Sequence, residues 1–301
     1  MKLPFVIYKL NLMKNLKLFI ELTRLDKPIG YMLLFWPCLW GLTIAYDFNN
    51  DFNIFIFYLF LFFAGSILMR SAGCIVNDIA DRNFDKQVAR TKNRPIASGK
   101  ISIFLATVYV IILCSLAFLV LINFNKLTIF LAIASMPLAI IYPLMKRFTY
   151  WPQLFLGITF NYGLILGWVS INESISFIPL VFYLGAIFWS LGYDTIYGYQ
   201  DIKDDEIIGV KSTSIKFKNN PKKILFLCYS ITFLLLIHIG LLMNFNYIYF
   251  LFLIFPFVHL FFFQLIKLNA KNPDVCLKIF KSNNYLGLII FLNLLVGKLT
   301  L

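Results

Sequence analysis

The chain has 301 residues, 60% of them hydrophobic, and a mean hydropathy of +0.81. A soluble protein of this length cannot bury so much apolar surface, so the composition excludes that class and indicates an all-α, polytopic membrane protein. The net charge of +13 would suggest a nucleic-acid partner in a soluble chain. In a membrane protein such a charge is typical of basic cytoplasmic loops, and the expected partners are anionic headgroups of the lipid bilayer and an anionic substrate.

In chain order, a basic segment over residues 1–27 precedes the apolar part of the chain. It holds six Lys and Arg residues, no acid before Glu21 and no transit-peptide pattern, so we interpret it as a cytoplasmic segment lying on the membrane surface. Residues 28–301 are predicted to form one domain of nine transmembrane helices around a central cavity. Because a spanning helix needs about 20 apolar residues, the expected spans are 28–46, 54–76, 101–123, 127–143, 152–171, 176–196, 223–243, 247–266 and 283–299.

The basic residues test this order of spans. With nine spans, 24 of the 27 Lys and Arg residues fall on the side of the N-terminus, and Lys126 and Lys298 fall on the other side. The positive-inside rule then places the N-terminus in the cytoplasm. The remaining cation, Arg70, lies within the second span, where a guanidinium needs an anionic partner. A substrate carboxylate, a diphosphate or a structural Asp would serve.

Eight of the fourteen acidic residues gather in two clusters, one after the second span and one after the sixth. These spans are an even number apart, so both clusters are predicted to emerge on the same cytoplasmic face. Carboxylates close to a bilayer are costly and usually functional. By contrast, His238 and His259 lie on separate apolar stretches without metal-ligand spacing, so helix packing is the default interpretation for both.

Each cluster is predicted to project one acidic stripe from a helix or its cytoplasmic extension. In the first cluster, Asn77, Asp81 and Asp85 are spaced i, i+4 and i+8, and Asp78 shares the same broad face. Asp in the second cluster recurs at i, i+7 and i+11, with a Tyr at i+3. The residues of the second stripe are Asp194, Tyr197, Asp201 and Asp205.

Two such stripes offer enough oxygens for one or two Mg²⁺ ions, which prefer a few carboxylates, retained waters and phosphate oxygens. Magnesium bound there can hold a diphosphate. Basic residues near the clusters can neutralise the same charge, and each of them also fits positive-inside topology alone. These residues are Arg90, Lys92, Arg94, Lys146, Arg147 and Lys211.

The two clusters resemble the paired aspartate motifs of the UbiA superfamily of intramembrane prenyltransferases. The first motif reads Asn77-Asp78-x-x-Asp81-x-x-x-Asp85, and the second runs from Asp194 through Asp205. Further stretches are similar to the branch of that superfamily that prenylates 4-hydroxybenzoate in ubiquinone synthesis. They begin at Arg24, Leu34, Met69, Arg94, Tyr142, Tyr193 and Gly209. The one departure from the pattern is Ile202-Lys203, where a more acidic pair is expected.

The resemblance implies an Mg²⁺-dependent transfer of a polyprenyl group from polyprenyl diphosphate to the ring carbon of 4-hydroxybenzoate ortho to its hydroxyl. It also implies a multi-pass protein of the bacterial inner membrane with a cytoplasmic active site. The implied metal ligands are Asp78, Asp81, Asp85, Asp201 and Asp205. The implied catalytic residues are Asp194, which holds metal or deprotonates the aromatic ring, and Arg70 and Arg147, which hold the aromatic carboxylate. The implied substrate-binding residues are Arg24, Asn77, Tyr142, Lys146, Tyr197 and Lys211.

Two alternatives stay open. Another member of the superfamily, of the menaquinone, haem O or lipid-ether type, would share the aspartate motifs, but Arg70 and the stretch 142–147 favour a carboxylated phenol. A membrane transporter is the alternative from a different class, and it predicts ionisable residues near mid-span and helices broken by Gly or Pro. The acidic residues instead gather at one membrane face.

Overall fold

The computed structural model describes residue 13, residues 15–88 and residues 91–299. The described residues form helices joined by turns and include no strand, which confirms the all-α prediction. The first part of the segment predicted over residues 1–27, and the predicted cation Arg90, lie outside the described residues. The division of the chain into that segment and one domain of residues 28–301 stays a prediction.

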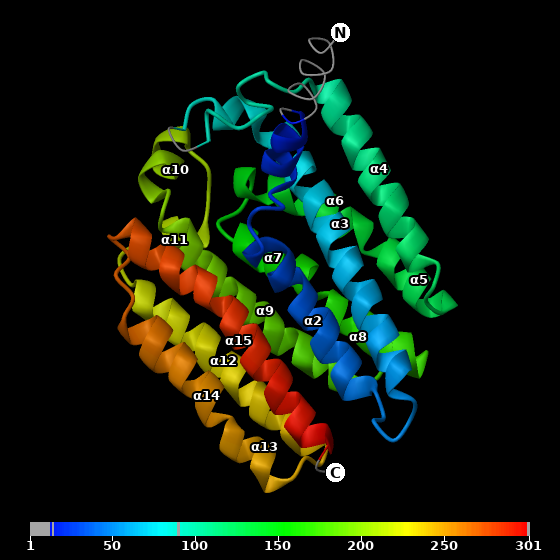
Figure 1. Cartoon of the computed structure of the whole chain (residues 1–301). Coiled ribbons are helices and arrows are strands. Elements are labelled where there is room, and N and C mark those ends of the chain that lie inside the picture. The colour runs from blue at the N-terminus through cyan, green and yellow to red at the C-terminus, as the bar shows by residue number, and fades with distance from the viewer. Residues whose placement is uncertain (1–12, 14, 89–90, 300–301) are drawn as a thin grey trace. The chain divides into compact units, whose positions relative to one another are not determined.

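Among the described residues, nine apolar helical segments correspond one for one to the nine predicted spans (Figure 1). Eight of them are long and apolar enough to cross a membrane, and the ninth, α2, is a shorter apolar helix of 17 residues. The chain is therefore a multi-pass membrane protein. Six segments are single helices, namely α2 (Ile29–Ala45), α3 (Phe52–Asp85), α4 (Ile103–Leu121), α9 (Phe177–Gly198), α12 (Pro221–Leu242) and α15 (Pro273–Leu299).

The other three segments change helix type or direction within the span. They are α5 (Lys126–Ala134), α6 (Met136–Ile141) and the 3-10 helix η1 (Tyr142–Arg147); α7 (Pro152–Asn161) and α8 (Gly163–Asn172); and α13 (Tyr247–Phe252), α14 (Ile254–Phe257) and the π-helix η2 (Val258–Ile266). Pro137 and Pro143 lack the backbone N–H that a continuous α-helix requires, and the first of these segments tightens into η1 at the second proline.

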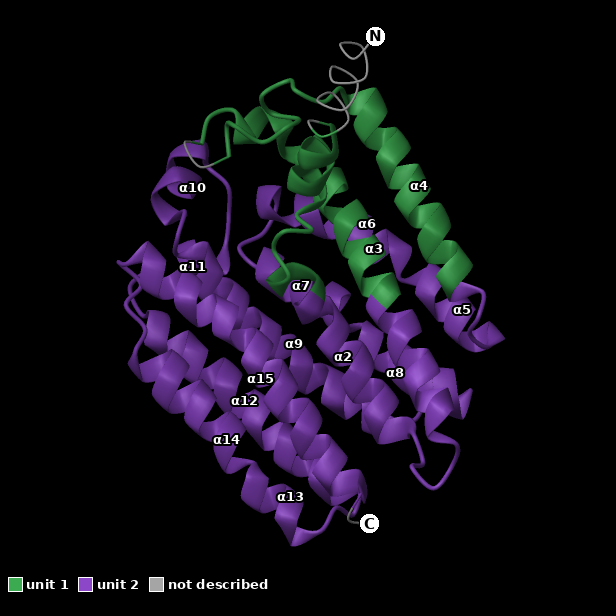
Figure 2. Ribbon diagram, in the orientation of Figure 1, with its two compact units in different colours: residues 1–31, 64–120 green, residues 32–63, 121–301 purple. Residues whose placement is uncertain are grey.

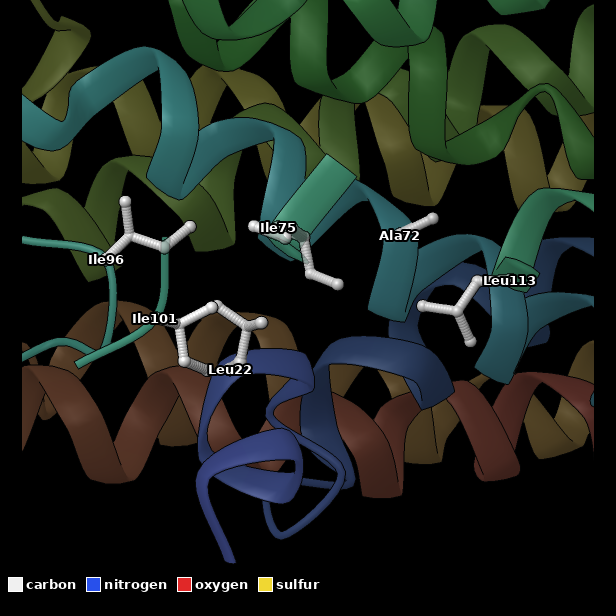
Figure 3. Close-up of a cluster of buried hydrophobic side chains, with 7 residues drawn as sticks. Leu22, Ala72, Ile75, Ile96, Ile101 and Leu113 are labelled. Atoms are coloured by element: carbon white, nitrogen blue, oxygen red, sulfur yellow. The ribbon is translucent and has the colours of Figure 1, made fainter. Parts of the chain in front are cut away.

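Two compact units make up the structure (Figure 2). Unit 1 contains the described residues up to Tyr31 and residues 64–120, and so holds the end of α3 and all but the last residue of α4. In its core, residues before α2 and from the loop after α3 pack against α3 and α4 (Figure 3). The buried members are Leu22, Ala72, Ile75, Ile96, Ile101, Ala106 and Leu113. This apolar contact fixes the loop against the end of α3 that carries the first aspartate motif.

Unit 2 contains residues 32–63 and the described residues from Leu121 onward, and three glycines set the spacing of α2 and α8 within it. A Cβ on Gly167 would lie 2.3 Å from the carbonyl oxygen of Cys38, and one on Gly41 would lie 2.0 Å from that of Leu164. Gly163 leaves room for the Cys38 sulfur in the same way. Two small residues four apart let transmembrane helices approach closely, so α2 and α8 pack backbone to backbone.

Helix α9, which carries the start of the second aspartate motif, packs against α7, α12 and α15 (Figure 1). A buried polar network fixes it there. Asn283 Oδ1 accepts from Trp189 Nε1 at 2.8 Å and from Gln264 Nε2 at 3.0 Å, and the Tyr229 hydroxyl donates to Gln264 Oε1 at 2.7 Å. In an apolar environment polar groups must satisfy one another, so the network holds α9, α12, η2 and α15 in one arrangement.

A double-mutant cycle on Trp189→Phe and Asn283→Leu measures this network. We expect each change alone to lower the free energy of unfolding. The two changes together should cost about 0.5–1.5 kcal/mol less than the sum of the single costs, because either change alone already breaks the Trp189–Asn283 hydrogen bond. Unfolding of the detergent-solubilised protein provides the measurement. Additive costs would show that the Trp189–Asn283 contact contributes nothing.

Candidate active site

The first aspartate motif lies on the last turns of α3, which runs as one helix to Asp85. Its aspartates are buried, with exposures of 2% for Asp78, 2% for Asp81 and 7% for Asp85, whereas Arg82 is exposed. The motif is therefore helical with one buried acidic side, as predicted. Negative side chains at a helix C-terminus face the negative end of the helix dipole, so this stripe needs positive partners.

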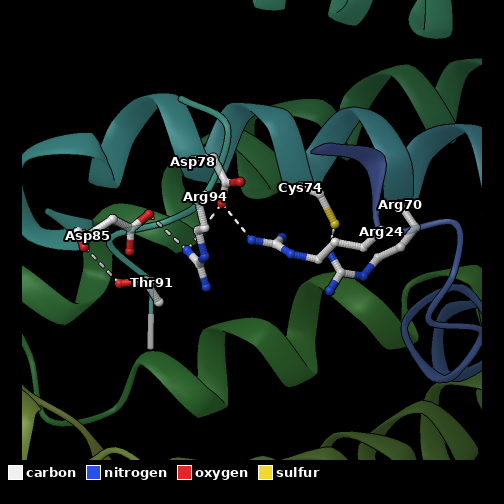
Figure 4. Close-up of polar contacts among 7 residues, drawn as sticks. All are labelled: Arg24, Arg70, Cys74, Asp78, Asp85, Thr91 and Arg94. Atoms are coloured by element: carbon white, nitrogen blue, oxygen red, sulfur yellow. Dashed lines mark hydrogen bonds and ion pairs between the residues drawn. The ribbon is translucent and has the colours of Figure 1, made fainter. Parts of the chain in front are cut away.

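Two arginines from different segments supply the positive charge (Figure 4). Arg24 Nη2 lies 2.5 Å from Asp78 Oδ1. Arg94 Nη1 donates to the same oxygen at 3.1 Å and to Asp85 Oδ2 at 2.8 Å. The Thr91 hydroxyl donates to the Asp85 carbonyl oxygen at 3.0 Å and ties the loop to the helix end. Charge-assisted hydrogen bonds of this kind are stronger than neutral ones, so the stripe is held firmly.

Arg24 reaches Asp78 from an unusual backbone conformation. Its φ is +56°, in the left-handed region that a residue with a Cβ rarely adopts. Strain of this kind is concentrated at functional sites, where the surrounding structure maintains it. Burial alone lowers the pKa of Arg24, but Cys74 and Asp78 beside it raise that pKa above its ordinary value. Arg24 is therefore a permanent cation.

Arg70, the cation predicted inside the second span, lies on α3 two turns before Asp78. Its Nη1 lies 2.7 Å from Cys74 Sγ, one turn further along the helix. A Cβ on Gly30 would lie 2.8 Å from Arg70 Nε, so the absence of a side chain at position 30 makes room for the guanidinium. Figure 4 shows the side chains of Arg70 and Arg24 close to Cys74. Two of the cations predicted to bind substrate thus lie beside one α3 side chain.

Arg94 is a candidate site residue that the sequence indicated only as one of several nearby cations. Its ion pairs with Asp78 and Asp85 place it in the site. The available signal in the sequence was the stretch Arg94-Pro95-Ile96-Ala97-Ser98-Gly99, one of those that resemble the 4-hydroxybenzoate branch. In the structure this stretch forms a turn. The Ser98 N–H donates to the Arg94 carbonyl oxygen at 2.9 Å.

We expect Arg94→Ala to lower kcat/KM for the prenyl diphosphate that the resemblance implies as substrate roughly 10- to 100-fold, because truncating a partly buried charge pair costs about 2 kcal/mol or more. Steady-state kinetics in membranes measures the effect. Arg82→Ala removes an equal charge from an exposed position of the same helix and is expected to keep wild-type kinetics. Equal kinetics for the two variants would remove Arg94 from the site.

The second aspartate motif does not form one helical stripe, and that prediction is wrong. Asp194 lies on α9, which ends at Gly198. Asp201 has a non-helical φ of −114° with ψ of 10° and precedes the short helix α10 (Ile202–Ile208), which carries Asp205. Asp194 therefore lies on one helix, and Asp201 and Asp205 lie together on the next, where the Asp205 N–H donates to the Asp201 carbonyl oxygen at 2.9 Å. The i, i+7 and i+11 spacing would place the three aspartates on one face only if α9 continued to Asp205.

Contacts with α11 (Thr213–Lys216) explain why α9 ends where it does. The Ser214 hydroxyl donates to the Thr195 carbonyl oxygen at 2.8 Å, and the hydroxyls of Thr195 and Thr213 share a hydrogen bond of 2.6 Å. A Cβ on Gly198 would lie 2.3 Å from Ser214 Oγ. This close approach requires glycine, whose low helix propensity also favours an end at that residue. The segment carrying Asp201 and Asp205 is thereby anchored beyond the break.

The last turns of α9 carry the half-buried Asp194 together with two tyrosines that pack against α15. The ring of Tyr197 lies 4.5 Å from that of Phe280 on α15, and the ring of Tyr193 lies 5.8 Å from it. The Ser190 hydroxyl donates to the Tyr193 hydroxyl at 3.0 Å. These contacts fix the helix face on which Asp194 lies, and they give Tyr197 a packing role beside its predicted substrate role.

The remaining predicted substrate residues come from η1 and the segment before α11. Tyr142 begins η1, and Lys146 and the exposed Arg147 end it. The Lys146 carbonyl oxygen accepts from the Lys211 N–H at 2.8 Å. The structure therefore brings the backbones of two predicted diphosphate cations together, although they are far apart in the sequence.

Among the described residues, no three His, Cys, Asp or Glu side chains converge into a closed metal site. Mg²⁺ does not need such a site, because it binds through one or two carboxylates, retained waters and substrate phosphates. Both motifs offer aspartate oxygens, which are the hard donors that this ion prefers. Asp78 and Asp85 also lie within reach of one shared cation, Arg94. The residues fit magnesium by donor chemistry, and their individual roles stay predictions.

The chain is similar to known proteins over most of its length. The family model described as the UbiA prenyltransferase family matches residues 34–295. Over 281 residues the chain is 41% identical to the 4-hydroxybenzoate octaprenyltransferase of Psychromonas ingrahamii, covering 93% of this chain and 96% of that protein. Over 288 residues it is 43% identical to the mitochondrial 4-hydroxybenzoate polyprenyltransferase of Bos taurus, covering 95% of this chain and 76% of that protein. The solved structure of a UbiA homolog from Archaeoglobus fulgidus bound to GPP and Mg²⁺ matches with a TM-score of 0.66 at 16% identity, covering 92% and 99%.

Proposed function

Because the chain belongs to the UbiA prenyltransferase family, we propose that it transfers a polyprenyl group from a polyprenyl diphosphate to 4-hydroxybenzoate. The products are 3-polyprenyl-4-hydroxybenzoate and diphosphate, and the reaction serves ubiquinone biosynthesis. The observation that carries this proposal is the buried aspartate stripe of α3 with its two arginines. It lies in a chain whose similarity to relatives named for this reaction extends over more than nine tenths of its length.

The aspartates of both motifs are proposed to bind Mg²⁺ and, through it, the diphosphate. They are Asp78, Asp81, Asp85, Asp201 and Asp205, with Asn77 assisting. The ion supplies positive charge that stabilises the departing diphosphate. The Archaeoglobus fulgidus homolog bound to GPP and Mg²⁺ supports this choice of metal. Arg24 and Arg94 already lie on these carboxylates, so cations are in place for the diphosphate oxygens, and we assign Tyr142, Lys146 and Lys211 to the same substrate.

Arg70 and Arg147 are proposed to hold the carboxylate of 4-hydroxybenzoate, since guanidinium and carboxylate form two parallel hydrogen bonds. The carbon–oxygen bond of the diphosphate ester breaks, and the ring carbon ortho to the hydroxyl forms the new carbon–carbon bond. Asp194 takes the proton that this ring carbon loses, and Tyr197 contacts the substrate. The apolar surroundings keep water from the allylic cation.

We further propose that the protein resides in a bacterial inner membrane with its active site on the cytoplasmic side. The asymmetric distribution of Lys and Arg over the loops supports this orientation, and bacterial relatives such as that of Psychromonas ingrahamii support the setting.

A choice between acceptors tests the function. Membranes containing the protein are incubated with a polyprenyl diphosphate and either 4-hydroxybenzoate or 1,4-dihydroxy-2-naphthoate, with Mg²⁺ or with EDTA. We expect a prenylated product from 4-hydroxybenzoate alone, and only when the metal is present. Product from the naphthoate alone would reject the acceptor and keep the family. Prenylated product formed in EDTA, from either acceptor, would reject the role of the metal.

A further inference from the structure

A groove of about 610 Å³ lies between η2 and α15, and its lining includes none of the residues proposed for the reaction. Phe263, Leu277 and Tyr285 form apolar walls. Charged and polar side chains also line the groove. They are Asp274, Lys278, Lys281, Ser282 and His259. An apolar groove with grouped polar residues is the usual form of a site for an amphipathic ligand.

The charges of this groove are ordered along α15. Asp274, Lys278 and Lys281 are spaced i, i+4 and i+7, so they share one face of the helix. Lys267, at the end of η2, adds a third cation, because its Nζ lies 4.9 Å from the centre of the Phe263 ring. Three lysines and one aspartate leave this end of the groove with a net positive charge. An anionic ligand is therefore favoured there.

His259 contributes a hydrogen-bond donor deeper in the groove. Gln264 Nε2 lies 3.1 Å from His259 Nδ1. An amide nitrogen can only donate, so Nδ1 is the acceptor and the neutral ring carries its proton on Nε2. Nε2 is buried and lacks a well-formed hydrogen bond, and the Ser282 backbone carbonyl is the acceptor nearest to the ring. A buried N–H gains from a well-aligned acceptor, so a ligand oxygen in the groove would complete the hydrogen bonding of His259.

The order of these groups matches one class of membrane molecule. Lys281 and Lys278 precede Ser282 by one and four residues, so they lie about 2–6 Å nearer to the start of α15 at a helical rise of about 1.5 Å per residue. Glycerophospholipids have the same order, with a phosphate, then ester carbonyls, then acyl chains. We propose that this groove binds an anionic glycerophospholipid from the bilayer. Its phosphate pairs with Lys278 and Lys281 beside Phe263 and Leu277, an ester carbonyl accepts from His259 Nε2, and an acyl chain continues past Tyr285, the lining residue furthest along α15.

Lipid binding to the purified full-length protein tests the proposal. Native mass spectrometry in detergent measures the affinities of phosphatidylglycerol and phosphatidylcholine with identical acyl chains. Wild type is expected to prefer phosphatidylglycerol about tenfold or more, since each basic residue near an anionic headgroup contributes measurably. Lys278→Gln with Lys281→Gln should abolish the preference. Lys100→Gln with Lys223→Gln removes the same charge from two exposed residues outside the groove and should retain it.

Leu277→Trp distinguishes the groove from a merely basic surface. The larger side chain fills the groove, so we expect weaker binding of both lipids while thermal unfolding confirms a folded protein. Equal wild-type affinities for the two lipids, or an unchanged preference in the Lys278 and Lys281 double variant, would overturn the proposal. Wild-type binding of phosphatidylglycerol by folded Leu277→Trp would place the lipid outside the groove and would also overturn it.

Discussion

Asp81→Asn is expected to reduce prenyl transfer on the order of 1,000-fold while the protein stays folded, because a metal–diphosphate site supplies several kcal/mol of charge stabilisation. Asp81 is 2% exposed and lies on the buried side of α3 between two aspartates held by arginines. Asparagine keeps the size of the side chain and removes its charge. Initial rates in membranes at saturating Mg²⁺ provide the measurement, and Asp201→Asn should show a loss of similar size.

Glu206→Gln is the matched control for these two variants. It makes the same change of acid to amide in the second acidic cluster, at an exposed residue paired with Lys218 at 2.6 Å. Surface pairs of this kind contribute little, so wild-type rates are expected. If folded Asp81→Asn membranes were as active as those with Glu206→Gln, the aspartate stripe would have no part in the reaction.

Gly167→Leu is expected to prevent folding or to destabilise the protein by about 3 kcal/mol or more, as overpacking against rigid backbone does. Even the first carbon of the new side chain would lie 2.3 Å from the Cys38 carbonyl oxygen and 2.6 Å from the Leu42 nitrogen. Neither backbone group can move without separating α2 from α8. The yield of monodisperse protein in detergent and its thermal unfolding measure the effect.

Gly65→Leu serves as the comparison, because a Cβ at Gly65 on α3 meets nothing within 4 Å. This variant is expected to fold with an unfolding temperature close to that of wild type. Equal yields and unfolding temperatures for the two leucine variants would show that α2 and α8 do not depend on the close contact seen at Gly167.

The sequence was sufficient to predict the nine apolar helical segments seen among the described residues and the acidic side of α3. Both depend on local patterns, namely apolar length and the helical spacing of Asp78, Asp81 and Asp85, which a continuous helix preserves. The break in the second motif depends on a contact between Gly198 and Ser214, sixteen residues apart, that no local pattern contains. The predicted arrangement of those aspartates was therefore wrong, and their roles stay predictions.

Arg94 illustrates a different limit. Every basic residue on a predicted cytoplasmic loop has the same explanation in positive-inside topology, so charge alone could not separate Arg94 from Lys92 or Arg90. Its selection depends on the turn that directs it back to Asp78 and Asp85. His259 was likewise interpreted as a packing residue, because its neighbour Gln264 and the groove beside it come together only in the folded chain.

The most direct test of the central claim uses purified protein reconstituted into lipid vesicles with a polyprenyl diphosphate, ring-labelled 4-hydroxybenzoate and Mg²⁺. The account predicts that label enters the lipid extract in a product whose mass equals the acid plus one polyprenyl group minus one hydrogen. It also predicts that Asp81→Asn and Asp201→Asn vesicles yield almost none. Folded, metal-supplied wild-type protein that leaves all of the label in the aqueous phase would contradict the assignment of this chain as a 4-hydroxybenzoate prenyltransferase.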